Sequence, residues 1–190
     1  MKHLLEWIIP IILLVAVVVL IIWFVITYNS YINLRNSSEA TLGQIRVAMK
    51  KRLDMIEQLL GAVKSYAAFE KGTFESVTKM RTSVVSAGAG DLNQIEGESR
   101  SLLGRLFAVM ENYPDLKTSE TVNSLMSSVK DIEDEIARHR YTYNNISQQF
   151  NTMLESIPSN IVGGFMHLDK LDYLKFEDEK DITKAPKISF

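Results

Sequence analysis

Residues 122–157 read VNSLMSSVKDIEDEIARHRYTYNNISQQFNTMLESI, and the spacing of their apolar side chains predicts the fold. Eleven positions follow one another in steps that alternate between three and four, and only His139 among them is not apolar. They are Val122, Leu125, Val129, Ile132, Ile136, His139, Tyr143, Ile146, Phe150, Met153 and Ile157. A repeat of this period predicts a helix of roughly 53 Å, ended by Pro158, whose seam packs along other helices as in a coiled coil.

The preceding chain has the same helical period. Residues 45–67 form an earlier apolar seam, which is expected to continue unbroken from Tyr31 and to end at Gly72. Two shorter helices are expected over 74–84 and 92–113, separated by the glycines at 88 and 90. Asp91 and Gln94 have the spacing of a capping box and favour a fresh helix start there, although a helix continuing through the glycines fits the spacing too. Short connections predict antiparallel neighbours, so the fold class is an all-α bundle of long helices.

A membrane anchor is predicted before the bundle. Residues 8–26 read IIPIILLVAVVVLIIWFVI and carry no charge, and with Trp7 and Tyr28 the stretch gives roughly 33 Å of helix, enough to cross a bilayer. Aromatic rings at both ends suit the headgroup level, and the proline is expected in the first helical turn. The residues assigned to the anchor are Trp7, Ile8, Pro10, Trp23, Ile26 and Tyr28.

Two alternatives to an uncleaved single-pass anchor fit less well. A secretory signal would be shorter and would end in a small-residue cleavage site, which residues 24–30 lack. A buried helix of a soluble core rarely carries so long an uncharged run. The charges flanking the run nearly balance, and Lys50, Lys51 and Arg52 incline the body toward the cytoplasm, which predicts a single-pass protein of the cell membrane.

The chain is therefore divided into an anchor (1–28), a helical bundle (29–158) and an extended C-terminal tail (159–190). Gly163 and Gly164 are expected to form a hinge, and the apolar residues spaced by three over 165–174 fit a short helical turn or a strand laid on the bundle. Ile188 and Phe190, which end the chain, are expected either to fold back onto the bundle or to bind a partner as an added strand.

Composition excludes several classes of function. With 21 basic against 23 acidic residues the net charge is −2, so no positive field is available to hold nucleic acid. The chain has no cysteine, which excludes thiolate metal sites and cysteine nucleophiles. Its three histidines form no H-x-x-x-H pair, and neither His139 nor His167 has the glutamate of a di-iron motif three residues before it.

Other candidate sites have simpler structural interpretations. No phosphate-binding loop is present, and Ser99 lies in GESRS, which misses the last position of a nucleophile elbow. Carboxylates at 133–135 are expected on a solvated face, and His139 as a hydrogen-bonded or register-setting core residue rather than a ligand. The cluster of Lys50, Lys51 and Arg52 fits a solvated face or, alternatively, contact with anionic lipid. No cofactor, metal or catalytic residue is predicted, and the chain is expected not to be an enzyme.

Four separated stretches resemble the LemA family of membrane-anchored helical proteins. The most specific is RYTYN at 140–144, followed by FNT at 150–152 and IPSN at 157–160, which is similar to the R-x-x-YN…YNT…FP-x-N pattern of that family. KRLDMI at 51–56 with VKSY at 63–66, the turn NYPDLK at 112–117 and the ending APKISF at 185–190 agree with it as well. Glu57 and Leu42 stand where the family usually has proline and tryptophan, which indicates a divergent member.

The resemblance implies a bundle of long antiparallel helices behind one anchor, with the body in the cytoplasm, and it carries over no functional residues. Together with the residue patterns it predicts a non-enzymatic scaffold or adaptor that presents a bundle surface to an unidentified membrane or cytoplasmic protein. The alternative is a membrane-shaping or lipid-binding protein that forms homo-oligomers along the bundle. A hydrolase is disfavoured because no pairing of nucleophile and base is visible.

Overall fold

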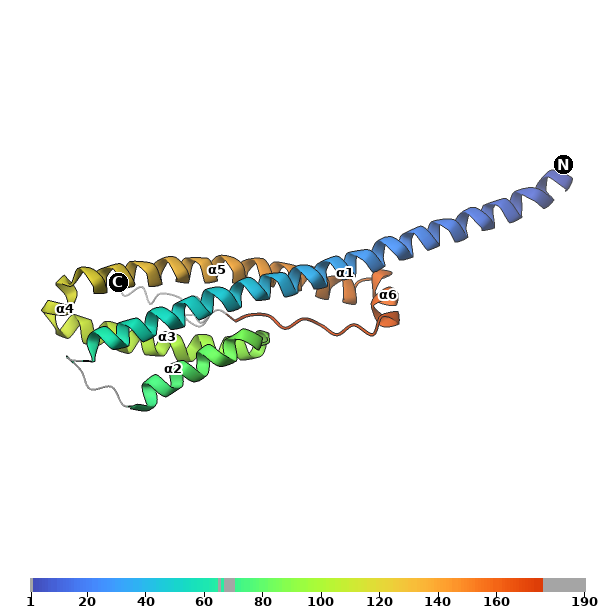
Figure 1. Cartoon of the computed structure of the whole chain (residues 1–190). Helices are drawn as coiled ribbons and strands as arrows, with labels where there is room; N and C mark the ends of the chain where they lie inside the picture. The colour runs from blue at the N-terminus through green and yellow to red at the C-terminus, as the bar shows by residue number, and fades with distance from the viewer. Residues whose placement is uncertain (1, 65, 67–70, 176–190) are drawn as a thin grey trace, which may run out of the picture. The chain divides into compact units, whose positions relative to one another are not determined.

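The structure is a computed structural model that describes residues 2–64, 66 and 71–175 (Figure 1). Within these ranges the regular structure is entirely helical and contains no strand, which confirms the all-α fold class. In chain order the elements are α1 (Lys2–Val63), α2 (Lys71–Ser83), the 3-10 turn η1 (Val84–Ser86), α3 (Ala89–Asn112), α4 (Pro114–Thr118), α5 (Glu120–Glu155) and α6 (Ser159–Phe165).

Helix α1 joins the apolar run to the bundle without a break. It contains 62 residues, so the expectation that the first bundle helix continues out of the anchor is confirmed. Two details of that expectation are wrong. Pro10 lies inside the helix rather than in its first turn, because the residues before it are already helical. The helix also ends at Val63, well before Gly72. Just after its end, the Tyr66 amide donates a hydrogen bond to the Val63 carbonyl.

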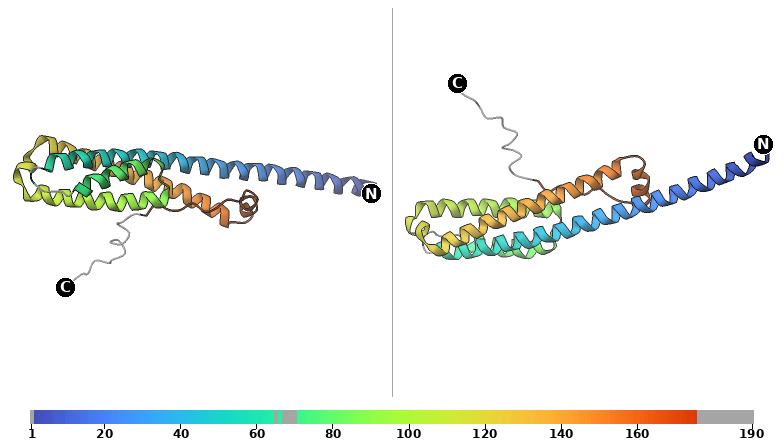
Figure 2. Two further views of the ribbon diagram at one scale, coloured as in Figure 1. Left: turned by 60° about the horizontal axis from the view of Figure 1, so that its bottom comes forward. Right: turned by 90° about the horizontal axis from the view of Figure 1, so that it is seen from above.

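The contacts divide the chain into two compact units, which we call unit 1 (Met1–Glu39 with Asn145–Leu171) and unit 2 (Ala40–Asn144 with Asp172–Phe190). Unit 2 holds the larger apolar core, built on buried leucine, isoleucine, valine and methionine side chains of α1, α3 and α5. Successive helices in this unit run in opposite directions (Figures 1 and 2), which confirms the antiparallel bundle.

Helix α2 packs Val77 and Met80 into the core of unit 2 and is also linked to α1 by an arginine. Arg81 places Nε 2.7 Å from Asp54 Oδ1 and Nη1 2.6 Å from Glu57 Oε2. Glu57 stands where the resemblance implies a proline, and in this chain it forms an ion pair. Helix α3 starts afresh as predicted, but Gly88 is its capping residue, and the Gly88 amide donates to the Asp91 carboxylate at 3.3 Å.

Unit 1 has a smaller core of aromatic and aliphatic side chains. Tyr31 packs edge-on against Phe150, with ring centroids 5.6 Å apart, and Val162 of α6 is fully buried beside them. Gly163 and Gly164 lie inside α6 and do not form the expected hinge. Residues 168–175 follow as an extended segment, which we call the strap, and it forms no strand pairing.

Candidate functional site

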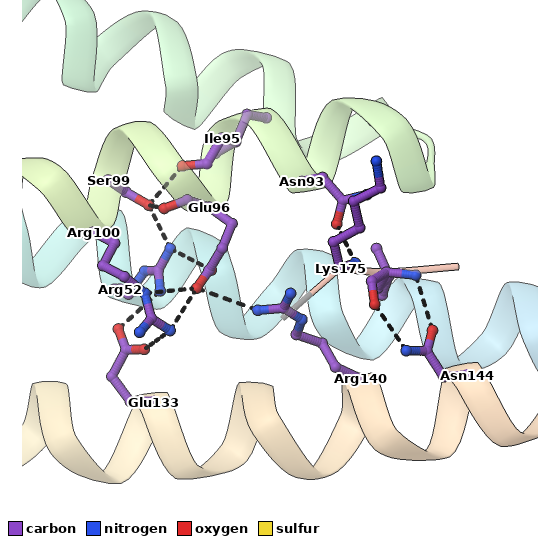
Figure 3. Close-up of polar contacts among 11 residues, drawn as sticks. Arg52, Asn93, Ile95, Glu96, Ser99, Arg100, Glu133, Arg140, Asn144 and Lys175 are labelled. Atoms are coloured by element: carbon purple, nitrogen blue, oxygen red, sulfur yellow. Dashed lines mark hydrogen bonds and ion pairs between the residues drawn. The ribbon is translucent and has the colours of Figure 1, made fainter. Parts of the chain in front are cut away.

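The most organised group of polar side chains is an ion cluster inside unit 2, formed by Arg52, Glu96, Ser99, Arg100, Glu133 and Arg140 (Figure 3). Three helices bring these residues together: Arg52 comes from α1, the next three from α3 and the last two from α5. We call this group the ion cluster.

Polar residues at seam positions create the cluster. Along α1 the buried residues Ile45, Met49, Arg52, Ile56 and Leu59 follow steps of four and three, so Arg52 occupies a core position. Arg140 stands between Ile136 and Tyr143 on α5 by the same steps. The sequence pattern predicted His139 rather than Arg140 on the seam of α5 and Arg52 in a solvated or lipid-facing cluster, and it therefore missed the ion cluster. Arg52 at a core spacing is the signal that could have revealed it.

Glu96 is the centre of the cluster. Its Oε2 lies 2.7 Å from Arg52 Nη2, and its Oε1 lies 3.0 Å from Arg100 Nη2 and 3.3 Å from Arg140 Nη1. Arg52 Nη1 bonds Glu133 Oε1 at 2.8 Å, and Arg52 also donates to the hydroxyl of Ser99. Ser99 in turn donates to the Ile95 carbonyl at 2.6 Å. Three guanidinium groups thus meet two carboxylates, and each of the three helices contributes at least one charge.

Burial makes this cluster sensitive to the loss of any member. Arg52 is 0% exposed and Glu96 and Arg140 are each 4% exposed, whereas the side chains of Glu133 and Arg100 are 29% and 40% exposed. Burial by itself raises the pKa of Glu96, but Arg52, Arg140 and Arg100 together outweigh it and hold that pKa below its usual range. Burial lowers the pKa of Arg140, Glu96 raises it and the two other arginines lower it, and the net direction is down.

The ion cluster is suited to stabilising the bundle. A carboxyl whose pKa is lowered stays ionised near neutral pH, so Glu96 is not suited to act as a general acid. The cavity beside Glu96 and Arg140 holds about 10 Å³, which is about the space of one water molecule and too little for a substrate. Three buried charges that meet at one level, one from each helix, favour a single register of the three helices. Glu133, expected on a solvated face, is a half-buried member of this cluster because it borders the seam.

Three asparagines hold the strap. In unit 2 the Asn144 side chain donates to the Leu174 carbonyl at 2.8 Å and accepts from the Leu174 amide at 2.9 Å. In unit 1 Asn151 makes the same pair with Leu171, at 2.9 and 2.8 Å. Asn93 on α3 accepts from the Lys175 amide at 2.9 Å (Figure 3). The strap is extended but is not the predicted strand, because side-chain amides supply the hydrogen bonds that a neighbouring strand would otherwise give, and Phe165 belongs to α6.

The six residues assigned to the anchor all belong to α1. Among the described residues, α1 is the one helix long and apolar enough to cross a membrane, and its most apolar stretch is not buried inside the protein. Trp7, Ile8, Ile26 and Tyr28 are exposed, and Pro10 is exposed as well, whereas Trp23 is partly buried against the core of unit 1.

Three cations, Lys50, Lys51 and Arg52, were expected on a solvated face or in contact with anionic lipid, and two of them are exposed. Lys50 and Lys51 are exposed, and Lys51 lies 3.6 Å from Glu135. The expectation for Arg52 is wrong, because its guanidinium is buried inside the bundle and pairs with Glu96 in the ion cluster. Ile188 and Phe190, the predicted partner-binding residues, lie outside the described residues. His139 is partly buried and faces Glu135 at 3.8 Å, as a contact on the helix surface.

An open apolar groove runs between α3 and α5 in unit 2. Its volume is about 760 Å³, and Leu103, Phe107 and Met126 are among the side chains that line it. A second hollow of about 310 Å³ shares Phe107 and Met126 with it. The described residues contain no group of three His, Cys, Asp or Glu side chains able to hold a metal ion.

Comparison with known proteins identifies a matching family and several similar proteins. A sequence profile for the LemA family matches residues 41–190. Magnetosome protein MamQ 2 of Paramagnetospirillum magneticum is 24% identical over 92% of this chain and 73% of its own length. Magnetosome protein MamQ of Magnetospirillum gryphiswaldense is 23% identical over 86% of this chain and 72% of its own. Protein LemA of Metamycoplasma hominis is 26% identical over 70% of this chain and 62% of its own.

Proposed function

Because this chain belongs to the LemA family, we propose that it acts as a non-enzymatic scaffold or adaptor, held at a membrane by the apolar part of α1. The observation that carries the proposal is the continuity of α1: one helix contains both the exposed apolar run and the buried seam of the bundle. A bundle attached in this way stays at the membrane surface whenever the anchor is inserted.

The polar residues of the bundle support the same role. The buried charges of the ion cluster pair with one another beside a cavity too small for a substrate, which favours a role in stabilising the bundle. The names of the relatives state no reaction either. Both observations favour a binding role over catalysis.

The surface that best suits a protein partner is the groove between α3 and α5. Phe107 and Met126 are only partly buried there, and aromatic and methionine side chains are typical of protein interfaces because they combine large apolar area with adaptable packing. We therefore infer that a protein partner of the adaptor inserts apolar side chains into this groove.

A photo-crosslinking residue at position 126, in the full chain in its native membrane, tests the proposal. The expected result is one discrete crosslinked protein that is not a second copy of this chain. Thr142, exposed on the same helix, is the matched control and should not capture that protein. Crosslinking at position 126 that yields only dimers of this chain, or none at all, would contradict the adaptor and favour the self-associating alternative.

The orientation of the body in the cytoplasm is a second part of the proposal. Lys50 and Lys51 are exposed cations that follow the anchor, and basic residues on this side favour the cytoplasm. Since the chain has no cysteine, a single Thr142→Cys substitution gives one thiol to label. A membrane-impermeant thiol reagent should label it only after the cells are opened, and labelling in intact cells would contradict the proposed orientation.

A further inference from the structure

Unit 1 exposes three large apolar side chains outside the apolar run. Ile157 is 84% exposed, Ile161 65% and Phe165 71%. They are spaced by four residues, just before α6 and along it. Exposure of such side chains to water forfeits the favourable free energy that burial of their apolar area would give. Three of them within nine residues form a patch of the kind that marks a membrane or protein contact.

The patch adjoins the membrane-crossing part of α1. The Phe165 ring packs edge-on against Phe24, with centroids 5.8 Å apart, and Phe24 lies within the uncharged run. Trp23 and Phe24 also pack against the core of unit 1, in which Val162 of α6 is fully buried. Helix α6 therefore lies beside the last turns of the predicted span.

A close approach fixes the inner side of α6 against α1 and α5. A Cβ atom added to Gly163 would lie 2.5 Å from Leu154 Cδ2 and 3.0 Å from Tyr31 Oη, so only glycine fits there without a shift. Tyr31 Oη also donates to the Ser159 carbonyl at 3.1 Å. Gly164, by contrast, has no atom within 4 Å of an added Cβ. One side of this short helix is thus packed tightly while the other is open.

From this placement we propose that Ile157, Ile161 and Phe165 insert into the lipid bilayer and form a second membrane contact next to the anchor. The inference rests on the proposed membrane anchor. Lipid is the occupant because the patch is continuous with the span: acyl chains that surround Phe24 also reach the Phe165 ring packed on it. Apolar side chains of interfacial helices sink about 5–10 Å below the headgroups, and Phe24 lies one turn, roughly 6 Å, before Tyr28 at the expected headgroup level.

The second contact would give α6 a role in fixing the bundle at the bilayer. A single helix can tilt and rotate in a membrane, whereas a helix with an apolar patch bound beside it has a preferred rotation about its own axis.

Lipid quenching of single fluorescent labels tests this inference in the full chain. Because the sequence contains no cysteine, Ile161→Cys can be labelled with an environment-sensitive fluorophore after reconstitution into phosphatidylcholine vesicles. Nitroxide-labelled lipid, with its quencher near the headgroups, should quench this label several-fold more than a label at Gln148→Cys, an exposed position of unit 1 on α5. Ile157→Cys, at the most exposed of the three positions, provides a second site that does not depend on packing.

A label at Val15→Cys, in the middle of the apolar run, separates the two proposals when it is tested with a second lipid that carries its nitroxide deep in the acyl chain. If lipid quenches the label at 15 but not those at 157 and 161, the anchor stands and the inference about α6 is wrong. If none of these labels is quenched, the anchor is wrong and the inference falls with it. Labels at 157 and 161 that are shielded from water but not quenched by lipid would show that protein covers the patch, which also overturns the inference.

Discussion

Units 1 and 2 use different means to hold their helices in place. Unit 2 buries Arg52, Glu96 and Arg140 among its apolar side chains, whereas the buried polar residues of unit 1 are uncharged: Thr27, Ser38, Ser147 and Asn151. Unit 1 relies instead on Tyr31, Phe150 and the close approach at Gly163. Matched charges therefore align the helices of unit 2, whereas the shape of the side chains aligns those of unit 1.

The difference fits the surroundings proposed for each unit. Buried charges need full pairing and cost most where water is scarce, so a unit beside the bilayer gains from an uncharged core. Unit 2, with its larger core, can enclose a paired cluster. The exposed apolar patch of unit 1 is consistent with this proposal, because apolar side chains are more stable in contact with lipid than with water.

Removing Glu96 should have the largest effect. Glu96→Ala leaves Arg52 and Arg140 buried without their shared carboxylate, which is expected to lower the free energy of unfolding by about 3 to 5 kcal/mol. Chemical denaturation of the full chain in detergent micelles measures it. Glu135→Ala, which removes a surface contact with Lys51, is the matched control and should cost about 0.5 kcal/mol or less. Equal effects of the two substitutions would show that the ion cluster does not stabilise unit 2.

Gly163→Val tests the shape-based alignment of unit 1. Because Leu154 and Tyr31 already occupy the space of a Cβ atom, overpacking is expected to cost about 1 to 3 kcal/mol. Hydrogen exchange should accelerate at the amides of α6 while the amides around Glu96 keep their protection. Gly164→Val, at an open position of the same helix, is the control. Loss of protection in unit 2 alone would contradict the assignment of Gly163 to unit 1.

Asn144→Ala should release the strap from unit 2. The substitution removes both hydrogen bonds to Leu174, which is expected to cost about 1 to 2 kcal/mol in total. The readout is hydrogen exchange at the Leu174 amide, which should become fast, while the Leu171 amide bonded to Asn151 remains protected. Asn145→Ala, one residue along α5, should leave the Leu174 amide slow. A Leu174 amide that stays slow in Asn144→Ala would show that apolar packing alone holds the strap.

Acid should destabilise unit 2 through Glu96. The folded state holds the pKa of Glu96 below its usual range, and that of an unfolded glutamate is about 4.3. The stabilisation is therefore fully present above about pH 4.3 and is lost as the pH falls through the folded pKa. Glu96→Gln has no carboxyl to titrate, so its unfolding free energy should fall less steeply below pH 4.3 than that of the unchanged chain. Parallel slopes would exclude Glu96 as a source of acid sensitivity.

Periodicity predicted the helices well because burial and the 3.6-residue turn impose the same spacing on every seam. Val122, Val129, Ile136, Tyr143 and Phe150 are buried as expected. Leu125, His139, Ile146 and Met153 are only partly buried. Ile157 is exposed, because α5 ends at Glu155 and the next residues leave the seam. The apolar helix able to cross a membrane and the fresh start of α3 were predictable because length, charge and glycine position are local properties.

The sequence alone was enough to predict the four longer helices, their antiparallel order and the apolar run, since each depends on residues near one another in the chain, but it did not predict α4 or α6. Which of Lys50, Lys51 and Arg52 points inward could be seen only in the folded chain, because that depends on whether α3 and α5 bring carboxylates to the same level. The tertiary structure alone also placed Phe165 against Phe24. The two phenylalanines are far apart in the sequence, and no local pattern records which distant side chain will fill the space beside a given ring.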